Sequence, residues 1–404
     1  MMERASPPNY RTTPEAKARC GCRTHRQVSS ATIVAPAPRG ATGGRPREEG
    51  LAYEPNREDY QRLSLQFMRS ADRMGPLAAA RAFAGFGRRF SQDRDSLPQD
   101  DADRAFGLVA HATTIIDYEL PFSDDNQAAE LVKKGHELLD EALVLDAHCF
   151  DALRMQQASQ IGSFDGYYDF LQTEGEDVRD WCLEQRDRAL AREGGERGRI
   201  AANLAMRPLF RWRAMQASKA VICGRNHDAV EIARKLMALD PDDEADVRYT
   251  AMIALAKLED ARGLEELCQR GARIEASRGM STEQDAWAQL TRVAIAYKAL
   301  DLDGARDAIS RLDGTHPNAL SALAIQRELP DGVFSRLSTQ PRSEDELILA
   351  ISEGTVLLQE GRDKEGRGAL GAWLRDECLG RMDREGRARV FADEVEWGVG
   401  REVE

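Results

Sequence analysis

The sequence lacks the features that mark membrane, secreted and disulfide-rich proteins. No window of its 404 residues holds the roughly 18 consecutive apolar residues of a membrane span, and the N-terminus lacks the apolar core of a signal peptide. Its 7 cysteines are an odd number and follow no framework spacing, and a chain of this length can bury a core without disulfides. We therefore expect reduced thiols and a cytoplasmic protein.

Motifs for catalysis and cofactor binding are also missing. There is no Gly-x-Ser-x-Gly elbow, no His-Glu-x-x-His metal motif, no Walker loop, no Rossmann fingerprint after a strand and no Cys-x-x-Cys pair. Cys20, Cys22 and His25 are too few ligands for a structural zinc site. Cys149 follows His148 but has no third group in sight to orient the imidazole. The sequence thus predicts no catalytic residue, no metal and no cofactor, and a protein that is not an enzyme.

Aromatic residues are scarce and the charge is strongly negative. Aromatics make up 6% of the chain, and the abundant Ala, Leu, Arg and Glu favour helices over sheets. The net charge is −13 at pH 7, which argues against nucleic acid as a partner, because that binding depends on neutralising phosphates. Anionic membranes are disfavoured for the same reason. We expect an all-α protein whose partner is another protein or peptide.

Residues 217–249 have the pattern of two helices joined by a tight turn. Gly224 and Asn226 suit a turn with positive φ. Apolar residues then recur at three- and four-residue spacing and mark the buried stripe of an amphipathic helix: Ala229, Ile232, Ala233, Leu236 and Leu239. Asp240 and Pro241 end that helix, because proline disfavours the α conformation of the residue before it.

This unit looks like one tetratricopeptide (TPR) repeat, apart from Leu236, which stands where alanine is usual. Gly263 lies at the position of Ala229 one period later, since 263 − 229 is 34 residues. Residues 124–160 read as a divergent repeat of the same kind. The residues predicted to form the repeat framework are Gly224, Ala229, Ala233, Asp240, Pro241, Gly263, Trp287, Tyr297, Ala305 and Pro317.

The densest cationic and aromatic patch of the chain precedes this unit. Arg207, Arg211 and Arg213 interleave with Phe210 and Trp212. One interpretation is a site that holds a carboxylate of a partner, because the arginine guanidinium offers a planar fork of donors. The other is that these arginines pair with Asp and Glu of neighbouring repeats. Pro208 within the patch predicts a kink or a helix start.

The patch and the repeat together resemble a group of bacterial TPR proteins labelled as similar to the suppression-of-tumorigenicity-seven family. The residues that match are Arg207, Pro208, Arg211, Arg213, Ala214, Pro241, Asp243, Val247, Arg248 and Tyr249. Aspartates stand where asparagines are usual in that group, and Ala245 and Asp246 replace Gln-Gly. The resemblance covers residues 196–275 and implies a TPR-like fold with no known activity.

Composition divides the chain into four parts. Residues 1–55 are basic and rich in Pro, Gly and Ser, and bury too little apolar surface to fold, so we expect disorder there. Residues 56–195 form an N-terminal helical region with the divergent repeat, in which the glycine-rich 161–195 reads as an irregular insertion. Residues 196–395 hold the TPR-like repeats and a C-terminal cap, and 396–404 a tail. The expected fold is a right-handed TPR-like α-solenoid of antiparallel helix pairs.

The repeat pattern favours a cytoplasmic scaffold that binds a partner segment on its concave face. The predicted partner-binding residues are Arg207, Arg211, Arg213, Trp212, Arg248 and Tyr249. An alternative is a helical enzyme or regulator with a small-molecule site near the aromatic residues 164–170. An enclosed pocket with converging polar groups would favour that alternative, and an open groove the scaffold. A self-associating subunit would instead carry a large apolar patch at one end of the solenoid.

Overall fold

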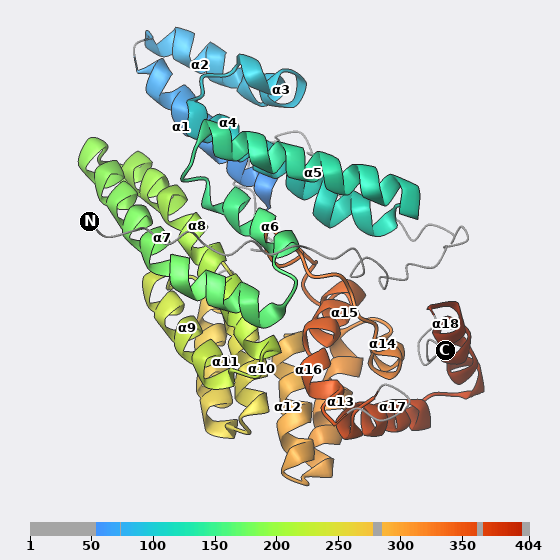
Figure 1. Ribbon diagram of the computed structural model, residues 1–404. Helices are drawn as coiled ribbons and strands as arrows, with labels where there is room; N and C mark the ends of the chain where they lie inside the picture. The colour runs from blue at the N-terminus through green and yellow to red at the C-terminus, as the bar shows by residue number, and fades with distance from the viewer. Residues whose placement is uncertain (1–53, 73, 278–284, 362–366, 398–404) are drawn as a thin grey trace, which may run out of the picture.

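The computed structural model describes residues 54–72, 74–277, 285–361 and 367–397, which contain helices and no β-strand (Figure 1). In chain order the α-helices are α1 (Pro55–Ala71), α2 (Pro76–Ala84), α3 (Phe86–Gln92), α4 (Asp101–Thr113), α5 (Asp125–Leu145), α6 (Phe150–Gln160), α7 (Phe164–Arg192), α8 (Gly195–Ile222), α9 (Asn226–Leu239), α10 (Val247–Lys257), α11 (Ala261–Ser277), α12 (Ala286–Lys298), α13 (Leu302–Thr315), α14 (Ala319–Ile325), α15 (Glu344–Glu353), α16 (Thr355–Leu358), α17 (Ala369–Arg381) and α18 (Arg384–Trp397). The prediction of an all-α fold is confirmed.

Two other predictions concern the ends of the chain. The segment predicted to be disordered falls almost entirely within residues 1–53, and most of the predicted tail falls within 398–404, so both lie outside the described residues. Within the described ranges, no helix combines the length and the apolar character that a membrane crossing needs.

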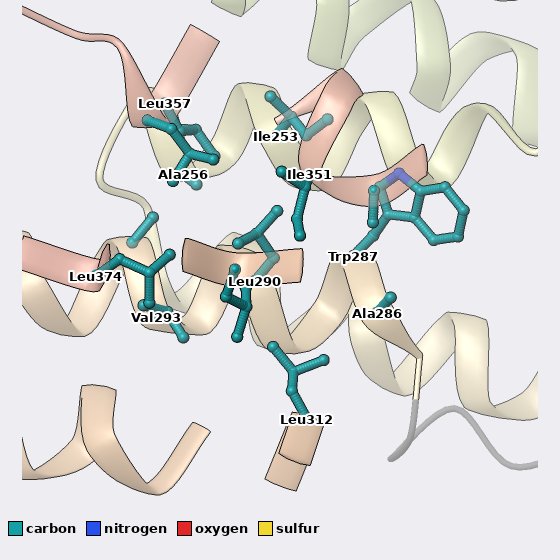
Figure 2. Packing of buried hydrophobic residues seen from close by; sticks show 14 of the residues in the cluster. Ile253, Ala256, Ala286, Trp287, Leu290, Val293, Leu312, Ile351, Leu357 and Leu374 are labelled. Atoms are coloured by element: carbon teal, nitrogen blue, oxygen red, sulfur yellow. The ribbon is translucent and has the colours of Figure 1, made fainter. Parts of the chain in front are cut away.

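Most helices pack against a neighbour in the sequence, and others pack on helices further along the chain, such as α1 on α4 and α14 on α17 (Figure 1). The pairs with extensive contact are α4 with α5, α7 with α8, α8 with α9, α9 with α10, and α12 with α13. Their buried side chains form two large clusters. One joins helices from α4 to α11, and the other joins helices from α7 to α18 around Trp287, Leu290 and Leu374 (Figure 2).

The turn between α8 and α9 follows the sequence pattern. Gly224 has φ +74°, a conformation that glycine adopts without a steric cost. α9 then begins at Asn226 and buries Ala229 and Ala233 completely against its neighbours. Because these two positions have no free space around a methyl group, they need small residues.

Replacing Ala229 with tryptophan should therefore lower the free energy of unfolding by about 1–3 kcal/mol, since a large side chain in a filled core forces its neighbours out of position. Urea unfolding measures the change. Ala238→Trp is the matched control, because Ala238 lies exposed on the same helix and should leave stability unchanged. Equal stability of the two variants would contradict the assigned helix face.

The turn between α9 and α10 buries an acidic group. The Asp240 carboxylate accepts a hydrogen bond from the Glu244 backbone N–H at 2.6 Å. Burial, with Glu244 and Asp243 nearby, raises the pKa of Asp240 to about 7. The folded protein thus holds this carboxyl in its protonated form at pH values where the unfolded chain is ionised.

This pKa makes stability depend on pH. The contribution of Asp240 is fully present below its ordinary pKa near 3.8 and is lost as the pH rises through about 7, because folding then requires burying a charge. Asp240→Asn keeps the acceptor oxygen and removes the charge, so it should stabilise the protein at pH 8 by at least about 1 kcal/mol and much less at pH 5. Urea unfolding at both pH values tests this, and an equal effect at both would refute it.

One expectation for the N-terminal half is wrong. Residues 161–195 do not form an irregular insertion, because α7 runs unbroken through its glycines. A Cβ at Gly175 would lie 2.9 Å from the Arg213 guanidinium and 3.3 Å from Trp212 Nε1. The glycine therefore allows α8 to approach α7 closely. Pro208 likewise lies inside α8, which begins well before it at Gly195, so it is not a helix start.

Candidate functional site

Arg211 is the best-buried member of the predicted arginine patch, with 2% of its surface exposed. From α8 it reaches Asp151 on α6 through two hydrogen bonds of 2.8 and 2.5 Å, and Glu58 on α1 through one of 2.7 Å. Burial alone would raise the pKa of Glu58, but Arg211, Arg62 and Arg207 outweigh it and hold that pKa well below its usual range. Arg211 thus joins three helices from the inside.

The rest of the patch is also engaged with neighbouring elements. Arg207 donates to Asn203 and Gln61. Arg213 donates to the Gly175 carbonyl and to Glu176 on α7. Trp212 is fully buried, and its indole N–H donates to the Leu171 carbonyl at 2.8 Å. The arginines of the patch therefore contact groups on neighbouring helices, and Arg211 and Arg213 pair with carboxylates there.

Arg248 and Tyr249 form a separate buried cluster at the start of α10. Arg248 contacts Asp243 at 2.9 Å and Asp246 at 2.8 Å, and reaches Glu275 on α11. Tyr249 stacks on Trp287 with ring centroids 4.0 Å apart. Of the six residues predicted to bind a partner, Arg211, Trp212 and Arg248 are buried, and Arg207, Arg213 and Tyr249 are half-buried.

Residues 326–343 join α14 to α15 without regular secondary structure, and we call them the connecting segment. Asp117 accepts hydrogen bonds from the backbone N–H groups of Val333 (2.9 Å) and Phe334 (3.2 Å). Arg154 on α6 donates to the carbonyl oxygens of the same two residues, at 2.6 and 2.5 Å. In Figure 1 this segment extends toward α6. Asp117 thus binds the N–H groups, and Arg154 the carbonyl groups, of the same two residues.

The Phe334 side chain is held in a closed pocket and is 1% exposed. Its ring packs edge-on against Phe106 on α4, with centroids 6.2 Å apart. The Arg211 guanidinium lies 4.5 Å from the ring centroid on the other side, a cation–π contact. Arg211 therefore serves both the helix framework and the connecting segment.

Two charged contacts flank this pocket. Lys219 on α8 pairs with Asp331 at 2.8 Å. Arg336 pairs with Glu353 on α15 at 2.6 Å and lies over the Tyr249 ring, 5.0 Å from its centroid. Three side chains of the connecting segment are therefore bound by the helices: the acidic Asp331, the aromatic Phe334 and the basic Arg336.

A cavity of about 470 Å³ lies beside the connecting segment, and we call it the inner groove. Its walls come from α8, α10, α15 and α16, and the segment itself forms one side. Among its lining residues are Phe164, Ser218, Lys219, Thr250, Ser352, Glu353 and Gln359. Of the aromatic residues near 164–170, Phe164 lines this groove and is 58% exposed, whereas Tyr167 and Tyr168 are core.

A second cavity of about 500 Å³ lies between α1, α4, α7 and α8. His148 stacks on Trp181 at its edge, with ring centroids 3.6 Å apart. Burial raises the pKa of the adjacent Cys149 to about 12, so its thiol is protonated at neutral pH. A protonated thiol is a weak nucleophile.

No protein-family model, curated protein or solved structure matches this chain. The candidate site therefore rests on geometry, and its main residues were not singled out from the sequence: Asp117, Arg154, Lys219, Phe334 and Glu353. The available signal was an apolar pair, Val333 and Phe334, inside a stretch otherwise typical of a surface loop.

Proposed function

We propose that this chain is a protein–protein interaction scaffold, an α-solenoid of TPR-like helix pairs that holds an extended segment of a partner protein in its inner groove. The observation that carries the proposal is that side chains beside the groove already bind the backbone of a non-helical stretch of chain, the connecting segment, which forms one side of the groove. Backbone groups are common to all sequences, so such contacts supply affinity while side-chain pockets supply specificity. The predicted arginine and tyrosine residues then act as supports for the groove walls.

The composition supports a protein partner and a cytoplasmic setting. The net charge of −13 disfavours nucleic acids and anionic membranes, and the groove offers charged groups of both signs in Lys219 and Glu353. A peptide with matching charges can pair with both. No catalytic group is required for this function.

A small-molecule regulator remains a second candidate, now at the second cavity rather than near residues 164–170. The Gln185 side-chain amide nitrogen is buried beside that cavity and has no hydrogen-bond partner. The stacked His148 and Trp181 rings add a flat apolar surface. A thermal shift with metabolites that Gln185→Leu abolishes would favour this candidate.

The scaffold proposal is tested by filling the groove. Ser218 lines the groove from α8, so Ser218→Trp should block a partner segment, whereas the exposed Ala238→Trp should not. Proteins captured from a host lysate by the wild type and by Ala238→Trp, but not by Ser218→Trp, would then be purified. Direct titration must reproduce the difference, with at least about tenfold weaker binding to Ser218→Trp. Equal binding to all three chains would overturn the assigned site.

A further inference from the structure

The connecting segment binds the groove in the manner of a peptide ligand. Leu329 exchanges hydrogen bonds with the Ser352 hydroxyl, and Val333 and Phe334 use their backbone groups to bind Asp117 and Arg154. These are side-chain-to-backbone contacts rather than helix or sheet ladders. A segment held in this way is recognised from outside, as a separate peptide would be.

Its side chains are recognised at regular intervals. Asp331 meets Lys219, Phe334 fills the pocket of Phe106 and Arg211, and Arg336 meets Glu353. Gly332 is required between them, because a Cβ there would lie 2.2 Å from the Ser335 carbonyl oxygen. The groove therefore recognises an acidic, an aromatic and a basic side chain, and the segment's own turn needs the glycine, which together give the pattern acidic, glycine, any residue, aromatic, any residue, basic.

The attachment of the segment is limited. Within residues 328–337, Phe334 is the one fully buried residue, and Glu328, Pro330 and Asp331 are exposed. The Asp331 carboxylate remains 58% exposed in its pair with Lys219, so water screens that contact. A competing peptide thus has to replace one buried ring, four backbone hydrogen bonds to Asp117 and Arg154, and the contacts of Arg336 with Glu353, the Asp246 carbonyl and Thr250.

We propose that residues 328–337, ELPDGVFSRL, are a displaceable wall of the inner groove, and that a partner segment with the pattern acidic-Gly-x-aromatic-x-basic takes their place on the surrounding helices. This inference rests on the proposed function and names its partner chemistry. The free chain is then self-occupied, and only a partner that carries the pattern, at sufficient concentration, opens the site.

The test uses a fluorescein-labelled peptide of sequence ELPDGVFSRL and the full chain. Phe334→Ala removes the anchor of the resident segment and leaves the receiving pocket intact, so fluorescence anisotropy should show at least about tenfold tighter binding of the peptide than by the wild type. Phe67→Ala is the matched control, because it truncates a buried phenylalanine in a separate cluster and should give no gain. Peptides with alanine in place of Gly332 or Phe334 should not bind.

A charge exchange tests the register of the peptide. Adding Lys219→Glu to Phe334→Ala should weaken binding of the native peptide, and a peptide with Asp331→Lys should restore it. A Phe334→Ala chain that unfolds cooperatively and yet binds the peptide no more tightly than the wild type overturns the inference.

Hydrogen exchange of the wild type gives a second readout that needs no variant. The amides of Val333 and Phe334 should exchange at least about 100-fold faster than those of Leu209 and Phe210 in α8, because release of the segment is local. Equal rates would show that the segment leaves only on global unfolding and would refute displacement. If Phe334→Ala binds the peptide more tightly but Ser218→Trp binds the captured partner as well as the wild type does, the groove binds only the chain's own segment. If Ser218→Trp loses the partner but Phe334→Ala gains no peptide binding, a partner binds beside a segment that is not displaced.

Discussion

Replacing Arg211 with methionine is expected to lower the free energy of unfolding by about 3 kcal/mol. The substitution leaves two carboxylates, Glu58 and Asp151, buried without the guanidinium that joins them. Breaking a buried pair by removing one partner costs about 3–5 kcal/mol, because a charge then stays desolvated. We expect the lower end of that range, since Arg62 still contacts Glu58 at 2.7 Å and Arg154 lies 3.4 Å from Asp151.

The pH dependence of this loss separates charge from packing. Arg211 lowers the pKa of Glu58, so the stability it provides is present above the ordinary pKa near 4.5 and is lost as the pH falls below it. The difference between wild type and Arg211→Met should therefore shrink between pH 7 and pH 4 in urea unfolding. Arg234→Met is the control, because its pair with Glu231 is exposed, and it should not change stability. A loss that is the same at both pH values would assign the effect to packing.

The helix pair around residue 224 could be predicted because its information is local. The positive φ of Gly224, the small buried residues of α9 and the acidic turn after it all lie within one short stretch of chain. Each follows from backbone sterics, helix periodicity or the cost of burying charge. The same reasoning identified the arginine patch and the possibility that it pairs with carboxylates.

Local reasoning could not supply the partners of that patch or the course of the connecting segment. Glu58 lies 153 positions from Arg211 in the sequence, and Asp117 lies 216 positions from Val333. The prediction of an irregular stretch around Gly175 was wrong for a related reason. The missing side chain of Gly175 allows α8 to approach and does not make a turn in α7. Such choices are made by tertiary packing, which overrides local propensity.

Trp287 connects the core of the C-terminal half to the inner groove. It lies almost fully buried on α12 (Figure 2). Its ring stacks on Tyr249. Its indole N–H donates to Glu353 at 2.7 Å, and the same carboxylate holds Arg336 of the connecting segment. The residue therefore has two separable roles, one in packing and one in orienting a groove carboxylate.

Trp287→Ala should remove both roles and lower the free energy of unfolding by about 3–5 kcal/mol, the usual cost of truncating a buried tryptophan. Trp287→Phe is the matched variant, because it keeps an aromatic ring against Tyr249 and deletes the N–H donor together with the remaining atoms of the indole. Its expected cost is about 2 kcal/mol, from one lost hydrogen bond and the smaller ring in a buried position. Urea unfolding at pH 7 compares the two, and near-equal losses would show that the ring kept against Tyr249 contributes little. Trp287→Phe should also make the Val333 amide exchange faster than in the wild type. The reason is that Glu353 loses the hydrogen bond that orients it and then holds Arg336 of the connecting segment less firmly.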